Sequence, residues 1–523
     1  MMTTMRTAAV ASTAAEITAL LLDLDAPVWI VRADGRVGAT ADQAVAAGAQ
    51  VLAAVAPLPP EHLGDSAFRA AHGVRSAYAA GAMANGIASP ALVKAMARHG
   101  YLAAYGAAGV APAVVDSALG ELATELGGQP FACNLIHSPS EPALERAIVD
   151  ACLRHGVRCV EASAFMDLTA EVVRYRAAGL TVDRQGGITI GHRVIAKVSR
   201  VEVADLFLRP APARLLADLV AAGRITTDQA RLAERVPMAD DITAEADSGG
   251  HTDRRPLTVL LPELIAARDR LAATVPGADR VRIGAAGGIG TPDAVAAAFG
   301  LGAAYVVTGS VNQSAVEAAQ CGATKTLLAK AEFADCAMSP SSDMFELGVQ
   351  VQVLRRGTMF AARAQRLYDT YRAYDGLDAL PATLRAELES SLFRRPLDEV
   401  WQECVRYFTE RDPAQLAGAE QDPKAQMALV FRWYLGLSSG WSIRGEADRV
   451  TDYQIWCGPA MGAFNTWAAG TYLAAPENRA VADIAGQLMT GAAYLTRVAQ
   501  LRTAGVRLPA ACARYVPRPL EDR

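Results

Sequence analysis

The chain has 523 residues, of which 52% are hydrophobic and 20% are charged, and its formal net charge is −5. This composition is typical of a folded, soluble enzyme, and the length accommodates a barrel of about 250 residues with additional elements. Without a long basic run, the sequence argues against nucleic acid or a membrane surface as partners. The eight cysteines show neither CxxC nor metal-ligand spacing, so we expect reduced thiols in a cytoplasmic protein and no metal site.

Residues 1–60 predict an N-terminal cap. Glu16 and Asp23 interrupt or bound its apolar patch, so neither a signal peptide nor a membrane span fits, and no later apolar run is long enough to cross a membrane. Apolar and polar residues alternate around Asp34-Gly35, which indicates a β-hairpin. The prolines within 57–60 then mark a linker.

From Tyr78 the pattern changes to short strands that alternate with amphipathic helices, the signature of a parallel sheet with crossover helices. We expect eight strands, at 78–85, 101–105, 131–136, 157–162, 194–199, 240–244, 281–284 and 304–308. Eight is the strand number of a (β/α)8 TIM barrel. The predicted fold class is therefore α/β, with such a barrel over residues 61–335.

Two long segments exceed the barrel repeat. Residues 201–237 predict a helical insertion between the fifth and sixth strands, and we interpret it as a candidate lid or docking element over the active-site face. Residues 340–523 predict a C-terminal helical domain that contains five of the six tryptophans. These aromatic residues indicate a packed core, and a surface for a partner or a second copy is the alternative.

The stretch VRIGAAGGIGTPDAVAAAFGLGAAYVVTGSVNQ, residues 281–313, carries the clearest functional signal. It places glycine turns after two successive strands, where a barrel commonly binds phosphate through backbone N–H groups. The alternative is that the glycines only connect strands to helices. The spacing of these glycines does not match the GxGxxG fingerprint of dinucleotide-binding proteins. We predict cofactor binding by the residues of the two turns, namely Gly287, Gly288, Thr308, Gly309 and Ser310.

Other strand ends supply candidates for the remainder of a cofactor site. The first strand runs into Ala82-Met83 within AMANG, where small residues let a flat ring lie close to the backbone, and the third strand contains Asn134. Lys197 lies in the apolar run IAKVS of the fifth strand. A buried lysine is costly unless it faces an anion, which favours a place beside an electron-rich cofactor edge.

The sixth strand leads into Gly249-Gly250-His251. The two glycines bring the backbone close to a ligand, so we expect them to bind the cofactor, and His251 is placed to transfer a proton near neutral pH. We predict His251 as the catalytic residue; a loop histidine that bonds only to its neighbours is the alternative. His137 is a second candidate, either for substrate contact or for loop structure. No GxSxG motif supports a serine hydrolase.

With these residues in view, the chain resembles the nitronate monooxygenase and 2-nitropropane dioxygenase superfamily. It is more specifically similar to the PfaD-like trans-acting flavin enoyl reductases of polyketide and polyunsaturated fatty acid synthesis. The resemblance covers nearly the whole chain from Pro27 and rests on GIASPALVKAMARHGYLAAYGAAG, HRVIAKVSR, VPMADDITAEADSGGHTDRRPL, GAAGGIGTPDAVAAAFGLGAAYVVTGSVNQ, MALVFRWYLGLSS and DYQIWCGPAMGAFN.

The resemblance implies a bound FMN that is reduced by NADPH and delivers hydride to the β-carbon of an enoyl thioester. The thioester would be held on acyl carrier protein domains of a synthase, and a homodimer is left open. It also implies that Met83, Asn134 and Lys197 line the isoalloxazine ring, that the glycine turns hold the phosphate, and that His251 is the active-site histidine. NADPH in preference to NADH follows from the family alone.

Two alternatives stay open. The first is a nitronate monooxygenase-like flavin oxidase, which would be reduced by a carbon-acid substrate instead of NADPH. The second is a non-catalytic scaffold of a synthase complex, which would not turn over.

Overall fold

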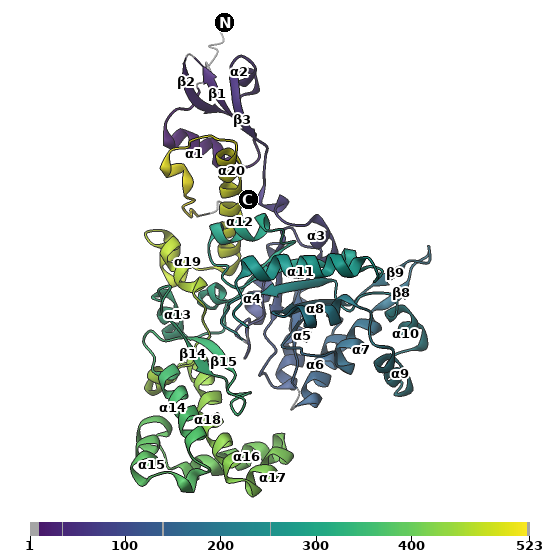
Figure 1. The fold of residues 1–523 in the computed structure, drawn as a ribbon, viewed down its shortest axis with the longest axis vertical. Coiled ribbons are helices and arrows are strands. Elements are labelled where there is room, and N and C mark those ends of the chain that lie inside the picture. The colour runs from purple at the N-terminus through teal and green to yellow at the C-terminus, as the bar shows by residue number, and fades with distance from the viewer. Residues whose placement is uncertain (1–9, 34, 139–140, 251–252, 520–523) are drawn as a thin grey trace.

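The computed structural model describes residues 10–33, 35–138, 141–250 and 253–519. Three parts follow one another along the long axis of the molecule (Figure 1). A small N-terminal sheet lies at one end, a barrel lies in the middle, and a group of helices lies at the other end.

Eight parallel strands close into a barrel, which confirms the predicted fold class. In barrel order they are β4 (Tyr78–Ala80), β5 (Leu102–Tyr105), β6 (Ala132–Ile136), β7 (Cys159–Ser163), β10 (Arg193–Val198), β11 (Asp241–Glu245), β12 (Arg282–Ala286) and β13 (Val306–Thr308). The first strand is shorter than predicted, because its pairing with β13 and β5 ends at Ala80, and the chain then turns at Asn85 and Gly86, which have φ angles of 57° and 73°.

Helices connect these strands on the outside of the barrel. They are α4 (Pro90–Arg98), α5 (Pro112–Leu126), α6 (Pro142–Arg154), α7 (Ala170–Ala178), α8 (Val201–Leu208), α11 (Leu257–Ala272) and α12 (Pro292–Gly300), and α13 (Gly322–Ala329) follows the last strand. Side-chain oxygens of Ser89, Thr169 and Thr291 cap the N-termini of α4, α7 and α12, because each accepts a hydrogen bond from a backbone N–H group in the first turn.

The helical insertion is present, but the structure contradicts its interpretation as a lid. Helix α8 takes the place of the fifth barrel helix, and α9 (Ala213–Ala221) and α10 (Thr227–Ala233) pack against α7 on the flank of the barrel (Figure 1). Helix α10 also contacts the hairpin β8 (Leu180–Val182) and β9 (Ile188–Ile190). Leu216 and Leu219 of α9 are buried, and Arg224 pairs with Glu171 of α7 at 2.9 Å. Burial of this apolar face holds the insertion to the outer wall.

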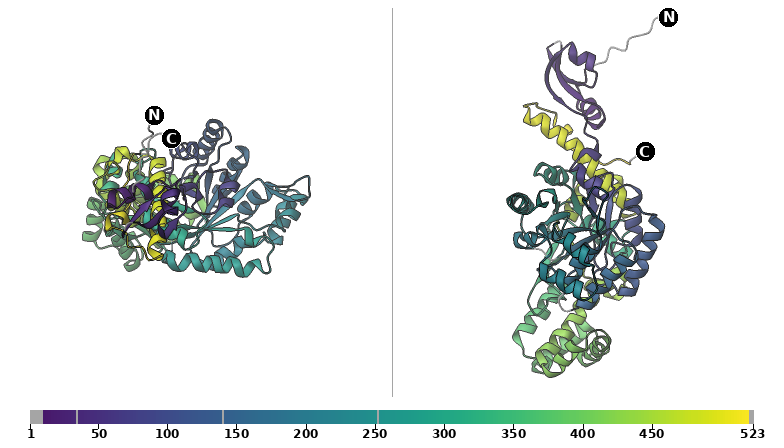
Figure 2. Two further views of the ribbon diagram at one scale, coloured as in Figure 1. Left: turned by 90° about the horizontal axis from the view of Figure 1, so that it is seen from above. Right: turned by 90° about the vertical axis from the view of Figure 1, so that its right-hand side faces the viewer.

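The N-terminal part contains the predicted hairpin. It comprises α1 (Ala14–Leu22), β1 (Val28–Ala33), β2 (Arg36–Thr40), α2 (Gln43–Ala47) and β3 (Gln50–Val55), with the antiparallel strand order β2-β1-β3. The long helix α20 (Val481–Thr503) packs on α12 and α4 of the barrel and reaches β3 (Figure 2). Its buried Arg497 donates to the backbone oxygens of Leu21, Asp23 and Ala26 at 2.7–3.0 Å. The C-terminal helix therefore joins the N-terminal sheet to the barrel.

The C-terminal part begins with the hairpin β14 (Cys336–Pro340) and β15 (Gln350–Leu354). The helical module comprises α14 (Phe360–Ala373), α15 (Ala382–Leu388), α16 (Leu397–Arg411), α17 (Pro413–Gln421) and α18 (Pro423–Arg444), and α19 (Ala460–Ala468) follows. Asp452 is fully buried and accepts hydrogen bonds from Arg363, Arg394, Arg449 and Tyr434, which join several parts of the module. Among the described helices, none has the length and apolar character needed to cross a membrane.

Candidate active site

The glycine turns lie at the carboxyl-terminal end of the barrel, called the carboxyl end below, where TIM barrels place their active sites. Gly287 and Gly288 follow β12 with φ angles of 85° and 71°. A Cβ atom on Gly287 would lie 2.6 Å from the carbonyl carbon of Ala246, so this turn requires glycine. A Cβ atom on Gly288 would meet no atom within 4 Å, so this turn faces open space.

The neighbouring turn after β13 is also open. A Cβ atom on Gly309 would meet nothing within 4 Å. Ser310 Oγ accepts a hydrogen bond from Gly458 N at 3.0 Å. Thr308 is 1% exposed, and its Oγ1 bonds to Tyr78 and Asn312, so its hydroxyl holds the strand end in place. Two adjacent open turns fit a phosphate group, because backbone N–H donors can approach the anion without a side chain between them.

A second cluster at the carboxyl end consists of charged side chains. Strand register places Lys197 beside Thr243, and Asn134 beside Glu161. The Nζ atom of Lys197 lies 3.3 Å from Glu245 Oε1 and 3.6 Å from Glu161 Oε1. Burial lowers the pKa of Lys197, but the two carboxylates outweigh burial and raise it above its usual value. Lys197 therefore keeps its charge, and the protein itself supplies anions to face it.

Glu161 is the residue that the sequence analysis missed. Its Oε1 accepts a hydrogen bond from Ala82 N at 3.2 Å, and its backbone oxygen accepts one from Asn134 Nδ2 at 3.1 Å. A signal was available, because a single carboxylate in the strand CVEAS is as unusual as the lysine in IAKVS.

The loop after β4 is tightly packed. Met83 is 8% exposed, and a Cβ atom on Gly106 would lie 1.8 Å from the Met83 oxygen. Asn85 Nδ2 donates to Ser439 Oγ of α18 at 3.2 Å. The predicted ring-side residues Ala82 and Met83 therefore lie in a loop that the barrel and the helical module hold together.

The predicted catalytic residue, His251, lies outside the described residues. Gly249 packs against the backbone of Cys457, whereas Gly250 faces open space. On one side of the loop, Ser248 Oγ donates to Glu245 Oε1 at 3.2 Å. On the other side, Asp253 pairs with Arg200 at 2.8 Å, and this hydrogen bond lowers the pKa of Asp253. The loop that carries position 251 is thus attached at both flanks to the carboxyl end.

His137, the second candidate, belongs to a packed cluster. Its Nδ1 lies 3.4 Å from Glu145 Oε2, and its ring stacks on Phe165 at a centroid distance of 5.2 Å. Burial raises the pKa of Glu145. These contacts favour the loop-structure alternative for His137.

The C-terminal part helps to build the carboxyl end. Besides the bond from Gly458 to Ser310, Gln313 donates to the Trp456 oxygen. Arg411 of α16 makes a two-point ion pair with Glu141, which precedes α6, at 2.8 and 3.0 Å. The segment after α18 and the helical module therefore border the site. The sequence analysis had expected the barrel alone to form this site.

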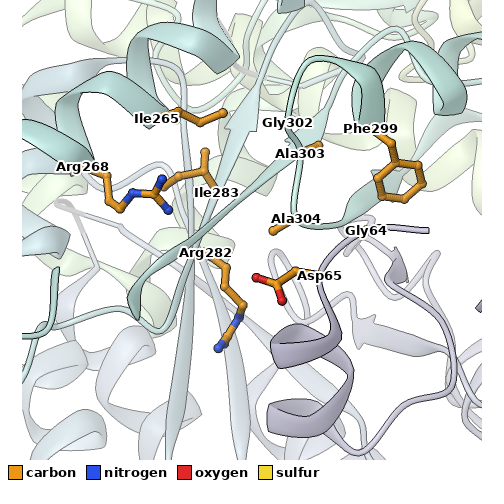
Figure 3. Close-up of a pocket in the computed structure, with 10 residues that line it drawn as sticks. All are labelled: Gly64, Asp65, Ile265, Arg268, Arg282, Ile283, Phe299, Gly302, Ala303 and Ala304. Carbon is orange, nitrogen blue, oxygen red and sulfur yellow. The ribbon is translucent and has the colours of Figure 1, made fainter. Parts of the chain in front are cut away.

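A cavity of about 310 Å³ lies at the opposite, amino-terminal end of β12 and β13 (Figure 3). Arg282 and Arg268 line it together with Asp65 and Phe299. Arg282 is engaged by Asp241 at 2.6 and 2.9 Å, and Arg268 donates to the Val281 oxygen at 3.1 Å. The cavity is thus remote from the glycine turns, and its cations are already neutralised or bonded.

Two segments match known family models. Residues 6–58 match the fatty acid synthase subunit PfaD N-terminal domain. Residues 374–453 match the inserted helical domain of [acyl-carrier-protein] S-malonyltransferase.

The chain is similar to components of known synthases. It is 47% identical over 489 residues to a polyunsaturated fatty acid synthase subunit of Thraustochytrium sp., an alignment that covers 92% of this chain and 32% of the relative. It is 42% identical over 441 residues to polyketide biosynthesis protein PksE of Bacillus subtilis, covering 84% of this chain and 57% of the relative. The chain thus spans less than two thirds of these relatives.

A solved structure resembles the chain along most of its length. The enoyl reductase domain of MlnA from the macrolactin biosynthesis cluster of Bacillus amyloliquefaciens superposes with a TM-score of 0.81 at 36% identity. The match covers 85% of this chain and 100% of that domain.

Proposed function

The chain belongs to the PfaD-like enoyl reductases of polyunsaturated fatty acid and polyketide synthesis, and from this premise we propose its reaction. We propose that it reduces the 2,3-double bond of enoyl thioesters on acyl carrier protein domains, with FMN as its cofactor and NADPH as the electron donor. The observation that carries the proposal is the pairing, at one end of the barrel, of two open glycine turns with the charged Lys197.

The residues present fit FMN. Gly287, Gly288, Gly309 and Ser310 would hold the phosphate through backbone N–H groups, because the space beside Gly288 and Gly309 is open. Ala82, Met83, Asn134 and Lys197 would lie along the ring, and Gly249 and Gly250 would bring the next loop close to it. When bound, FMN supplies hydride transfer between the nicotinamide and the enoyl chain.

The side chains of this protein would orient the reactants and manage charge. Lys197 brings an ammonium group, whose pKa Glu245 and Glu161 hold above its usual value, and this group would offset negative charge that develops nearby. The Nδ2 of Asn134 is committed to Glu161 O and Ser163 Oγ, and no group of the described residues bonds to its Oδ1, which a ligand would use. His251 would give a proton to the α-carbon or donate a hydrogen bond to the thioester oxygen.

Anaerobic stopped-flow spectroscopy tests this function. Protein loaded with FMN is mixed first with NADPH and then with a crotonyl thioester on an acyl carrier protein. We expect NADPH to bleach the flavin absorbance and the enoyl thioester to restore it, with formation of the saturated product. Bleaching by a nitronate but not by NADPH, or reoxidation by O2 alone, would instead support an oxidase.

Matched variants extend the test to the site. Lys197→Met should slow bleaching by at least about tenfold, the size of a lost electrostatic contact at an active site. Lys330→Met changes an exposed lysine near the end of α13 and should leave the rate unchanged.

A further inference from the structure

Glu161 is a buried carboxylate at the carboxyl end of β7, with a side chain that is only 6% exposed. Burial of a carboxylate is costly unless hydrogen bonds or opposite charges compensate it. The contacts of Glu161 therefore show which interactions compensate its burial.

Glu161 contacts three neighbouring elements at once. Its Oε1 binds Ala82 N in the loop after β4 at 3.2 Å and lies 3.6 Å from Lys197 Nζ of β10. Its backbone oxygen accepts from Asn134 Nδ2 of β6 at 3.1 Å. The contact with Asn134 is made by the main chain, so the carboxylate of Glu161 connects Ala82 and Lys197, two of the residues proposed to lie along the ring.

The second carboxylate oxygen is not used in the same way. Within the described residues, Glu161 Oε2 accepts no hydrogen bond, and a Cβ atom on Gly81 would lie 3.6 Å from it. The buried Glu171 of α7 is different, because Arg146 and Arg224 bond to its Oε1, and Arg224 and Arg174 bond to its Oε2. Glu161 thus keeps a partly uncompensated charge at the functional end, whereas Glu171 is fully paired.

We propose that Glu161 is a positioning residue of the reductase site, whose carboxylate fixes Ala82 relative to Lys197 and sets the negative charge beside the cofactor. The proposal rests on the function proposed above. It assigns to Glu161 two separable effects, one through the hydrogen bond to Ala82 N and one through charge.

The charge has a measurable consequence. Two-electron reduction adds negative charge to a flavin, so a nearby carboxylate disfavours the reduced state. Removing the Glu161 charge should therefore raise the midpoint potential of the bound flavin. A tenfold gain in the reduced over the oxidised form corresponds to about 30 mV for a two-electron couple.

Three variants separate these effects. Glu161→Gln keeps the shape and an acceptor for Ala82 N but removes the charge. Glu161→Ala removes both. Glu171→Gln is the matched control, since it neutralises a glutamate of similar burial that contacts arginines of α6, α7 and the α9–α10 loop instead of the site.

Two readouts are needed. The first is the flavin midpoint potential of the FMN-loaded full chain, measured by dye-coupled reduction. The second is hydrogen exchange of the Ala82 amide in the protein without FMN. We expect Glu161→Gln to raise the potential by about 30 mV, a tenfold change, with Ala82 protection retained. We expect Glu161→Ala to raise the potential and also speed Ala82 exchange at least tenfold.

The proposal is overturned if Glu161→Gln moves the potential no more than Glu171→Gln does, or if Ala82 protection is the same in Glu161→Ala as in the unchanged protein. Should Glu161→Ala fail to fold, the nearly isosteric Glu161→Gln still decides the charge effect. If the unchanged protein binds FMN but does not reduce the enoyl thioester, the proposed function fails, and both readouts still test the effects of Glu161 on Ala82 and on the flavin potential. If it binds no FMN, Ala82 exchange alone decides the positioning role.

Discussion

The two ends of the barrel strands both carry buried ionic clusters, but the clusters differ in how completely they are paired. At the amino end, Asp241 is fully buried and bonds to His72 at 2.7 Å and to Arg282 at 2.6 and 2.9 Å. At the carboxyl end, Lys197 lies 3.3 and 3.6 Å from its carboxylates, and one oxygen of Glu161 accepts no hydrogen bond from the described residues.

The packing around the two clusters also differs between the amino and carboxyl ends. Helix α3 (Ser66–His72) closes the amino end, where Phe68 stacks on Tyr305 at a centroid distance of 4.2 Å. At the carboxyl end, Gly288 and Gly309 face open space. A fully paired cluster stabilises the fold, whereas a loosely paired cluster beside open backbone can still bind a ligand. Variants at the amino end should therefore affect stability, and variants at the carboxyl end should affect function.

The largest effect is expected from Asp241→Asn, which leaves the largely buried Arg282 and the buried His72 without their carboxylate. We expect a loss of about 3 kcal/mol in the free energy of unfolding at pH 7. Urea denaturation followed by tryptophan fluorescence measures it. Asp269→Asn, which changes an exposed partner of Arg268, serves as the control and should cost less than about 0.5 kcal/mol. Equal losses in the two variants would contradict the structural role of Asp241.

The same variant has a defined pH dependence. Burial alone would raise the pKa of Asp241, but His72 and Arg282 outweigh it and hold the pKa below the usual 3.8. A carboxyl group with a lowered folded pKa stabilises the fold above the unfolded value and loses this contribution as the pH falls. The difference between the unchanged protein and Asp241→Asn should therefore shrink as the pH falls below about 4 and Asp241 takes up its proton. A difference that grows in acid would be inconsistent with the ion pairs.

The next effect is expected at the carboxyl end from Lys197→Met. Flavin content after purification should fall, and the affinity for added FMN should drop by about tenfold, equivalent to about 1.4 kcal/mol. The cost in stability should be smaller than for Asp241→Asn, because Glu245 is 15% exposed and its carboxylate can turn toward water, and the buried Glu161 keeps its hydrogen bond from Ala82 N. Full flavin content in this variant would argue against Lys197 as a ring-side residue.

A substitution in the open turn sharpens the comparison further. Gly309→Val places a branched side chain where a Cβ atom meets nothing within 4 Å. We expect weaker FMN binding with a change in stability below about 1 kcal/mol. Gly300→Val, at the end of α12, also faces open space and is the control. If both variants bind FMN like the unchanged protein, the phosphate lies elsewhere.

The smallest effect is expected from Arg411→Ala. Its ion pair with Glu141 is partly exposed, at 40% and 24% for the two side chains, so its loss should cost less than about 1 kcal/mol. The pair joins the helical module to the start of α6, so hydrogen exchange in residues 141–145 should accelerate. Unchanged exchange would mean that the module and the barrel are held together by other contacts.

The sequence predicted the features that depend on local pattern. The eight strands, the hairpin around Gly35 and the glycine turns of β12 and β13 follow from strand periodicity and from the freedom of glycine. Lys197 was also singled out, because a cation in an apolar run is unusual on its own.

The features that were missed depend on contacts between distant segments. Glu161 acquires its role from strand register, which sets it beside Asn134 and near Lys197. The lid interpretation of residues 201–237 was wrong because loop length does not reveal which wall buries Leu216 and Leu219. The contact of Gly458 with Ser310 joins residues that no local pattern relates.

The most direct test of the carboxyl end as the cofactor site is a fluorescence titration of FMN into the unchanged protein, Lys197→Met and Asp241→Asn. All three are titrated at one temperature where they are folded. We expect Lys197→Met to lose about tenfold in affinity and Asp241→Asn to bind like the unchanged protein despite its lower stability. Loss of affinity in Asp241→Asn with normal binding in Lys197→Met would contradict the assignment of the carboxyl end as the cofactor site.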